Sequence, residues 1–316
     1  MTTTISSFSL PSSRTISYAL STVSSEPNAP TILLSNSLCA PFTSWDHVVP
    51  KLTSKGFNVL RYDQPGHGAS IVPADLSSTT FLSLANDVYQ LLNHLSITRL
   101  YSWIGVSMGA ATGIVFAARY PNVVQKLVIC DTINCSHVHL NAVDVFGPRI
   151  AMAREAGNMD RIIDETLERW FGQAWMNTNP DETHRMRELM HGTSIDGYET
   201  CCAALRSSSF DLRLIAPRAG QNIKEALFVV GEKDANLPET MEDLRKGVES
   251  GNRKASAGLH VIKNAGHVCY VDGFDEFIAV ITRFLDQEKT NSNMTTFDQS
   301  QWSNESRFKF HKSGRN

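Results

Sequence analysis

The 316-residue sequence predicts an α/β fold, a mostly parallel central sheet flanked by helices. Short runs that are apolar throughout alternate with segments of helical periodicity, and one long stretch without strand candidates interrupts the alternation. One serine also lies between two glycines where a strand-like run becomes a helix-like run. Because strands buried on both faces are apolar throughout, these runs favour a parallel sheet with helices on both sides.

The strand candidates fall into two groups. Two early segments, SFSL and TISYALS, alternate apolar and polar residues and predict two strands near the N-terminus. The buried strands are predicted at residues 31–36, 58–63, 100–105, 126–131, 225–232 and 259–264. Helices are expected between or after them, at residues 43–55, 80–95, 108–119, 238–250 and 274–287.

The alternation breaks between residues 135 and 217, where several amphipathic helices are expected and no strand. We therefore predict a core of residues 1–134 and 218–288, with 135–217 as a helical lid over the carboxyl edge of the sheet, where such folds bind ligands. A packed helical subdomain without a gating role is the alternative. Residues 289–316 are polar without a sustained period, which predicts a disordered tail.

Composition argues against several classes of function. The apolar fraction of 42% suits a large core, and a net charge of −3 gives no basic surface for nucleic acid or an anionic membrane. There is no run of about 18 apolar residues and no basic, apolar secretory signal. A transit peptide stays open as the alternative to the early strands. We expect a cytoplasmic protein that acts on a small molecule without a metal or cofactor; its oligomeric state stays open.

The cysteines show neither a C-x-x-C pair nor His/Cys metal spacing, so free thiols are predicted. The six are Cys39, Cys130, Cys135, Cys201, Cys202 and Cys269.

Ser107 lies between Gly105 and Gly109, the G-x-S-x-G pattern of a nucleophile elbow. In an elbow, a sharp strand-to-helix turn lifts the serine hydroxyl above the sheet. The turn crowds its own backbone, so positions two before and two after the serine must be small. A glycine-containing loop before a helix is the alternative for so short a pattern.

A serine hydroxyl becomes a good nucleophile only beside a base that a third group orients. In this type of sheet the partners follow in the order serine, acid, histidine, each after a strand. His267, in a loop after the last strand candidate, is the predicted base. Asp234, after the 225–232 run, is the predicted acid, and Asp131, at the end of the 126–131 run, is the alternative.

Backbone N–H groups that stabilise a developing oxyanion complete such a site. We predict those of Met108, directly after the nucleophile, and of Ser37, in the loop after the 31–36 run, with Leu38 as the alternative to Ser37. The segment YDQPGHGAS, residues 62–70, is not G-x-G-x-x-G and is interpreted as a structural turn near the site.

These motifs resemble the α/β-hydrolase superfamily, and more narrowly the 3-oxoadipate enol-lactonases of aromatic catabolism. The segments LLSNSL…W, DQPGHGAS, IGVSMGAATG, LERWF, GYETCCAAL, VVGEKDANLP and AGHVCYVDG match that family's landmarks in order, over about residues 7–287. The resemblance implies the triad Ser107, Asp234 and His267 and the oxyanion positions Ser37 and Met108.

The chain departs from that family at two places. Cys39 stands where the family usually has glycine, and Gln64-Pro65 replaces a more usual Thr-Arg. Because loops and lid set specificity while the fold does not, these departures weaken the inference to one substrate.

The expected function is a serine hydrolase that opens a small lactone or ester through an acyl-enzyme, most like 3-oxoadipate enol-lactone hydrolysis. The alternatives are a hydrolase or acyltransferase acting on a neutral biosynthetic ester or lactone, C–C bond hydrolysis by the same triad, or a ligand receptor with slow turnover. A carboxylate-bearing substrate requires a cation facing the pocket.

The substrate-binding candidates lie in the oxyanion loop and in the helical insert. Leu38 is one, and Trp170 either walls the pocket or fills the core of the insert. The candidate cations are Arg149, Arg154, Arg161 and Arg206.

Overall fold

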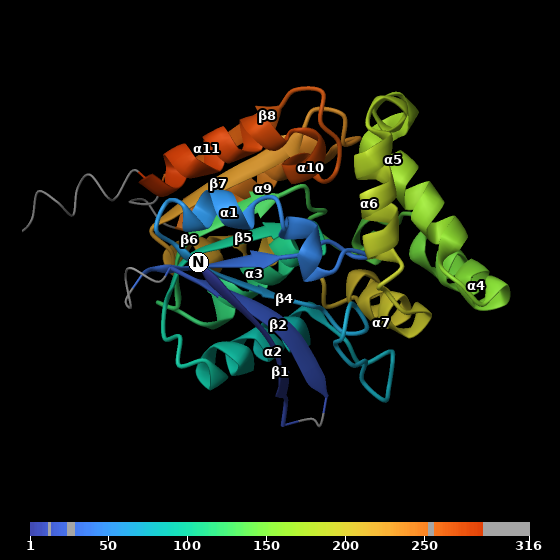
Figure 1. Cartoon of the computed structure of the whole chain (residues 1–316), viewed down its shortest axis with the longest axis horizontal. Helices are drawn as coiled ribbons and strands as arrows, with labels where there is room; N and C mark the ends of the chain where they lie inside the picture. The colour runs from blue at the N-terminus through green and yellow to red at the C-terminus, as the bar shows by residue number, and fades with distance from the viewer. Residues whose placement is uncertain (12–13, 24–28, 252–255, 287–316) are drawn as a thin grey trace, which may run out of the picture.

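The computed structural model describes residues 1–11, 14–23, 29–251 and 256–286, and an eight-stranded sheet forms its centre (Figure 1). The strands are β1 (Thr2–Ser9), β2 (Thr15–Thr22), β3 (Thr31–Ser35), β4 (Asn58–Tyr62), β5 (Leu100–Val106), β6 (Val124–Cys130), β7 (Glu225–Gly231) and β8 (Ala257–Ile262). Their order is β1-β2-β4-β3-β5-β6-β7-β8. β2 pairs antiparallel with β1 and β4, and all other neighbours are parallel, which confirms the predicted sheet.

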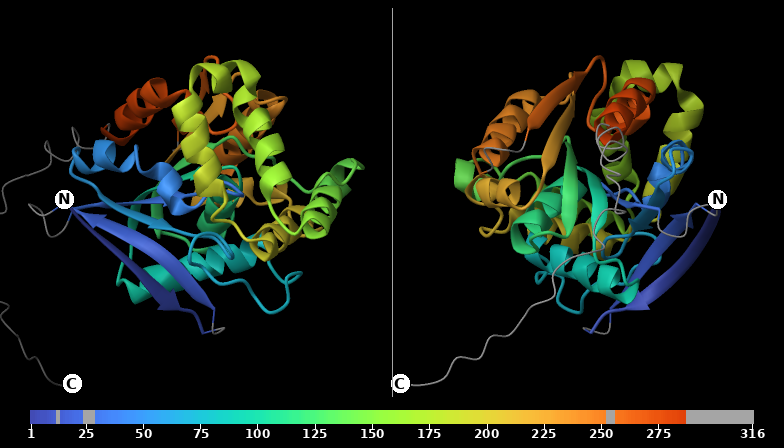
Figure 2. Two further views of the ribbon diagram at one scale, coloured as in Figure 1. Left: turned by 45° about the vertical axis from the view of Figure 1, so that its right-hand side comes forward. Right: turned by 90° about the vertical axis from the view of Figure 1, so that its left-hand side faces the viewer.

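Helices cover both faces of the sheet (Figure 2). One face carries α2 (Phe81–His94), α3 (Met108–Arg119), α8 (Ala216–Gln221) and α9 (Leu237–Gly251). The other face carries α1 (Val49–Thr53) and α11 (Phe274–Asp286), with the short α10 (Cys269–Asp272) beside them.

Strand β3 shows why the buried runs are apolar throughout. Ile32 and Leu34 pack into the core on the α11 side, while Leu33 between them packs into the core on the α3 side. All three are 0% exposed. Since successive side chains of a strand point to opposite faces, a sheet covered on both sides requires an apolar residue at every position.

Between β6 and β7 the described chain forms helices only. They are the 3₁₀ helix η2 (His137–Leu140), α4 (Phe146–Ala156), α5 (Asp160–Thr178), α6 (Pro180–Met190), α7 (Ile195–Arg206), the 3₁₀ helix η3 (Leu212–Leu214) and α8. Helices α4 to α7 lie together beside the sheet, on the right of Figure 1. α8 packs on α3 and α9, so the expected boundary at residue 217 falls inside a core helix.

The helix expected at residues 43–55 is divided. A 3₁₀ helix, η1 (Phe42–Trp45), precedes α1, and Pro50 lies in the first turn of α1. Proline fits there because its missing N–H would have no helical partner in the first turn. Periodicity alone does not distinguish one helix from two that share a buried face.

The structure also bears on the early strands, the cysteines, the expected absence of a membrane-spanning helix and the C-terminal tail. The early segments form β1 and β2, and the six cysteines are free and buried. No helix within the described ranges has the length and apolarity to cross a bilayer. The predicted tail at residues 289–316 lies outside the described residues.

Candidate active site

Ser107 occupies a strained turn between β5 and α3. Its backbone has φ 54° and ψ −117°, and α3 begins at the next residue. A Cβ on Gly105 would lie 2.4 Å from the carbonyl oxygen of Gly109, and one on Gly109 would lie 2.3 Å from that of Ser35. Neither position accepts a side chain, so the geometry of the turn accounts for the G-x-S-x-G pattern.

His267 and Asp234 form a buried pair. Nδ1 of His267 lies 2.6 Å from Oδ2 of Asp234, and the two side chains are 6% and 5% exposed. Burial lowers the pKa of His267 below its ordinary value and the nearby cation of Arg169 lowers it further, while Asp234 acts in the opposite direction. The net effect favours the neutral imidazole, the form that accepts a proton.

Ser107 and His267 line the same cavity. No hydrogen bond joins these two described residues in the structure. In free enzymes such bonds are often long and tighten only when substrate binds. The shared cavity therefore suits a nucleophile and base.

Asp131, the alternative acid, follows β6 and has a different partner. Its Oδ1 accepts a 2.8 Å hydrogen bond from the backbone N–H of Gly231, and burial raises its pKa well above the ordinary range. Gly231 ends β7, three residues before Asp234. Asp131 thus stabilises the strand end from which the Asp234 loop departs, and of these two described carboxylates it is Asp234 that bonds to the imidazole of His267.

The N–H groups of Ser37 and Met108 are unpaired within the described part of the chain. Both residues are 1% exposed and line the cavity with Ser107. Buried N–H groups without a partner are rare, so two beside one hydroxyl suit an incoming oxyanion. Leu38, the alternative donor, also lines the cavity and its N–H is equally unpaired.

The cavity has a volume of about 500 Å³ and lies between the strand ends and the helical insert. Trp170 lines it from α5 and stacks on His267 with ring centroids 5.9 Å apart. The same side chain is 1% exposed and packs in the apolar core of the insert. Trp170 therefore lies both in the cavity lining and in the apolar core, and its role as a substrate contact stays a prediction.

Of the four candidate arginines, the structure brings only Arg149 to the cavity. Its guanidinium donates to Oγ1 of Thr166 over 2.8 Å and forms no salt bridge with a described carboxylate. The other three lie outside the cavity and pair with carboxylates: Arg206 with Asp144, Arg154 with Asp196 and Glu199, and Arg161 with Glu165.

Arg169 is a cavity residue that the sequence reasoning missed. It is among the residues that line the cavity and is exposed. The protein packed around its guanidinium lowers the pKa of that group. It forms no salt bridge among the described residues. Thr166, Arg169 and Trp170 share one face of α5 at spacings of three and four, a helical signal that could have identified it.

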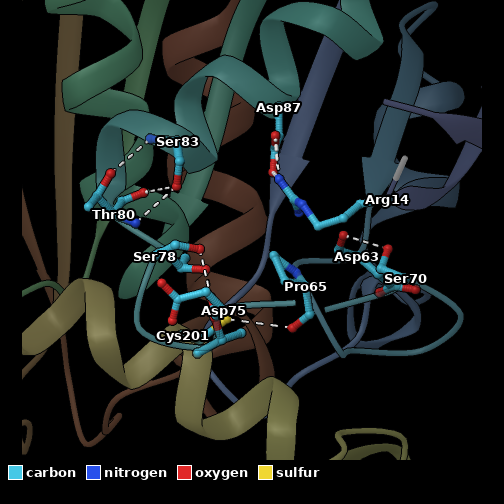
Figure 3. Close-up of polar contacts among 12 residues, drawn as sticks. Arg14, Asp63, Pro65, Ser70, Asp75, Ser78, Thr80, Ser83, Asp87 and Cys201 are labelled. Atoms are coloured by element: carbon cyan, nitrogen blue, oxygen red, sulfur yellow. Dashed lines mark hydrogen bonds and ion pairs between the residues drawn. The ribbon is translucent and has the colours of Figure 1, made fainter. Parts of the chain in front are cut away.

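The segment 63–70 contacts the loop that carries Ser37. The N–H of Phe42 donates to Oδ1 of Asp63 over 2.6 Å, and that of Cys39 donates to Nε2 of His67 over 3.0 Å. Figure 3 shows a further bond within the segment: the hydroxyl of Ser70 donates to the backbone carbonyl of Asp63 over 2.8 Å. The thiol of Cys201, on α7, lies 3.6 Å from the carbonyl oxygen of Pro65. The segment thus connects the insert with the Ser37 loop.

Similarity to known proteins agrees with this geometry. Residues 30–274 match the family described as alpha/beta hydrolase fold. The chain is 26% identical over 209 residues to 3-oxoadipate enol-lactonase 2 of Acinetobacter baylyi, covering 66% of this chain and 73% of the relative. It is 31% identical over 182 residues to 3-oxoadipate enol-lactonase 1 of the same organism, covering 56% and 63%.

A solved structure is similar over most of its length. The enol-lactonase from Burkholderia xenovorans LB400 has a TM-score of 0.76 and 30% identity, covering 89% of this chain and 99% of that one. The family match over most of the chain and the shared architecture lead to one conclusion: the chain belongs to the α/β-hydrolase fold family.

Proposed function

We propose that this protein is a serine hydrolase that opens a lactone or ester bearing a carboxylate. The observation that carries the proposal is the convergence of groups on one cavity. Ser107, His267 and the N–H groups of Ser37 and Met108 meet there, together with two arginines that have no salt-bridge partner among the described residues.

In the proposed reaction, Oγ of Ser107 attacks the acyl carbon while Nε2 of His267 accepts the hydroxyl proton. The carbonyl oxygen becomes an oxyanion that the N–H groups of Ser37 and Met108 stabilise. Asp234 holds the imidazole through Nδ1 and stabilises the imidazolium.

The intermediate then collapses and breaks the C–O bond to the leaving oxygen, which takes the proton from His267. In a lactone this step opens the ring and leaves an ester on Ser107. Water then attacks that ester while His267 accepts its proton. The bond between the acyl carbon and Oγ of Ser107 breaks, His267 returns the proton to Oγ, and the acid is released.

Arg149 and Arg169 support a carboxylate on the substrate. Both guanidinium groups belong to side chains that line the cavity, and neither has a salt-bridge partner in the described chain. Arg149 is half-buried and Arg169 is exposed. A substrate carboxylate in the cavity would form charge-assisted hydrogen bonds with guanidinium groups that no described carboxylate pairs with. The enol-lactonase names of the relatives agree with a substrate of this class.

Three exposed residues of the cavity lining are apolar. Ile133, Leu140 and Val145 line it and are 36%, 57% and 59% exposed. A volume of about 500 Å³ suits ligands larger than one small lactone ring. We therefore propose a substrate with a carboxylate toward the arginines and an apolar portion toward Ile133, Leu140 and Val145.

The test compares 3-oxoadipate enol-lactone with its neutral methyl ester, followed by ultraviolet absorbance. We expect a kcat/KM for lactone opening at least about tenfold higher for the charged compound, because a charged hydrogen bond contributes about 1.5–3 kcal/mol. Arg149→Met should remove most of this preference, and Arg161→Met, an exposed arginine on α5, should not. Equal rates for both compounds in the wild type would contradict the carboxylate subsite and favour a neutral ester or lactone.

A further inference from the structure

The peptide unit between Asn36 and Ser37 is bonded on its carbonyl side. Nε2 of Gln64 donates a 2.7 Å hydrogen bond to the carbonyl oxygen of Asn36. The N–H of the same peptide unit is that of Ser37, the proposed oxyanion donor. Asn36 and Gln64 are 0% and 1% exposed, so water does not substitute for this bond.

A trans peptide is planar, with its C=O and N–H pointing in opposite directions. A donor that fixes the direction of the Asn36 carbonyl therefore also fixes the direction of the Ser37 N–H. Bonding at the carbonyl further polarises the peptide, and this strengthens its N–H as a donor.

We propose that Gln64 is a positioning residue, which aims the N–H of Ser37 at the oxyanion and strengthens it as a donor. This inference rests on the proposed function, because it requires that the Ser37 N–H serves the oxyanion. Gln64 is also one of the two places where the chain departs from the enol-lactonase pattern.

Further hydrogen bonds fix the side chain of Asn36 and the backbone of Gln64. The side chain of Asn36 is bonded at both ends, since Nδ2 donates to the carbonyl of Tyr62 and Oδ1 accepts from Nε1 of Trp45, each over 3.0 Å. The backbone carbonyl of Gln64 accepts a 3.0 Å bond from the N–H of His67. With these groups fixed, the Gln64 amide is the described side chain that bonds directly to the Asn36–Ser37 peptide.

His67 holds the same loop at a second peptide. Its Nε2 accepts from the N–H of Cys39, and its Nδ1 lies 3.1 Å from the carbonyl of Pro65 and donates to it. Both bonds require the same neutral tautomer. Segment 63–67 thus fixes the oxyanion loop on both sides of Ser37 and Leu38.

The first test is Gln64→Met, which keeps the length of the side chain and removes the donor. We expect kcat on 3-oxoadipate enol-lactone to fall about 10- to 100-fold with KM nearly unchanged, because an oxyanion bond forms only in the transition state. The affinity for phenylboronic acid, which forms a tetrahedral adduct on serine, should fall by a similar factor.

Asn222→Leu is the matched control. Nδ2 of Asn222 donates over 2.9 Å to the backbone carbonyl of Ala117, away from the cavity. Its loss should lower the midpoint of thermal unfolding and leave kcat unchanged. If Gln64→Met behaves like this control, with a lower unfolding midpoint and an unchanged kcat, the amide is structural only and the inference is overturned.

Gln64→Glu is a second variant. Its readout is the pH dependence of kcat relative to wild type, which a purely structural role of Gln64 would leave unchanged. An ionised carboxylate cannot donate to the Asn36 carbonyl, whereas a protonated one can, and burial raises the pKa of a carboxyl group. The kcat of this variant relative to wild type should therefore recover as the pH falls. A deficit that does not change with pH contradicts the inference, whether or not Gln64→Met folds.

The proposals can fail separately. A wild-type protein that neither turns over the lactone nor binds phenylboronic acid overturns the proposed function and this inference with it. A wild-type enzyme that does both, with an unchanged kcat in Gln64→Met, overturns this inference alone.

Discussion

At the scale of single residues, the proposed chemistry depends on how neighbours adjust His267. Burial and the cation of Arg169 lower its pKa, and Asp234 raises it. A base whose pKa is lowered stays neutral to more acidic pH, so the free enzyme should keep its activity below the ordinary titration range of histidine. Arg169 thus lowers the pKa of the proposed base, and under the proposed function it also faces the substrate carboxylate.

Arg169→Met should move the acidic limb of the kcat/KM profile to higher pH, because removing a cation near an imidazole favours the imidazolium. Arg161→Met, on the same helix but outside the cavity, should leave the profile in place. The measurement is kcat/KM against pH for the three proteins. Coincident acidic limbs would show that Arg169 does not act on the base.

Sequence patterns predicted the residues whose chemistry is local. The G-x-S-x-G turn indicated Ser107, and the order of strand ends indicated Asp234 and His267. The role of Gln64 was not predicted, because it depends on a contact between distant segments. The bond of Gln64 is to a backbone carbonyl 28 residues away, and backbone partners leave no trace in a sequence.

At the scale of elements, segment 63–70 couples the oxyanion loop to the helical insert. From the sequence alone, residues 62–70 were interpreted only as a structural turn near the site. The turn is present, and its polar side chains bond to the backbone of residues 36–42. A neutral, buried His67 is part of this coupling, because an imidazolium could not accept from the N–H of Cys39.

Burial lowers the pKa of His67 from 6.5 to about 4. Since the unfolded chain binds this proton more readily, the contribution of His67 to stability is complete above pH 6.5 and decreases as the pH falls toward 4. Between pH 7 and 5, wild type should lose about 2 kcal/mol more unfolding free energy than His67→Gln.

Urea unfolding of both proteins at the two pH values measures this difference. Burial raises the pKa values of Asp63 and Asp272 to about 7, so these two groups stabilise the fold as the pH falls, opposite to His67. Both proteins contain them, so their contribution cancels in the difference between wild type and His67→Gln. Equal losses in wild type and His67→Gln would mean that His67 is not held neutral.

At the scale of the whole molecule, the proposed reacting groups follow strands of the sheet, and the helical insert contributes much of the cavity lining. Ser107, Asp234 and His267 follow strands, whereas Arg149, Arg169 and Trp170 lie on helices of the insert. The α/β alternation predicted the sheet and its order of motifs. It could not predict which insert side chains face the cavity, because an amphipathic helix does not reveal what its polar residues contact.

The exposed apolar lining residues Ile133, Leu140 and Val145 predict selectivity for substrates with an apolar portion. Val145→Asn should lower the gain in kcat/KM for each added methylene in a series of p-nitrophenyl esters, since burying a methylene contributes about 0.8 kcal/mol, or roughly fourfold. Val143→Asn is the matched control, because Val143 is 82% exposed and does not line the cavity. An unchanged gain in Val145→Asn would place the apolar portion elsewhere.

The most direct test of the central claim is the hydrolysis of 3-oxoadipate enol-lactone by wild type and by Ser107→Ala, followed by ultraviolet absorbance. We predict saturable turnover by the wild type and a loss of about 10⁶-fold in kcat for Ser107→Ala, because the triad acts as a unit. Turnover by Ser107→Ala at a rate comparable to wild type would contradict the assignment of Ser107 as the nucleophile. An absence of turnover in the wild type would remove this lactone as the substrate.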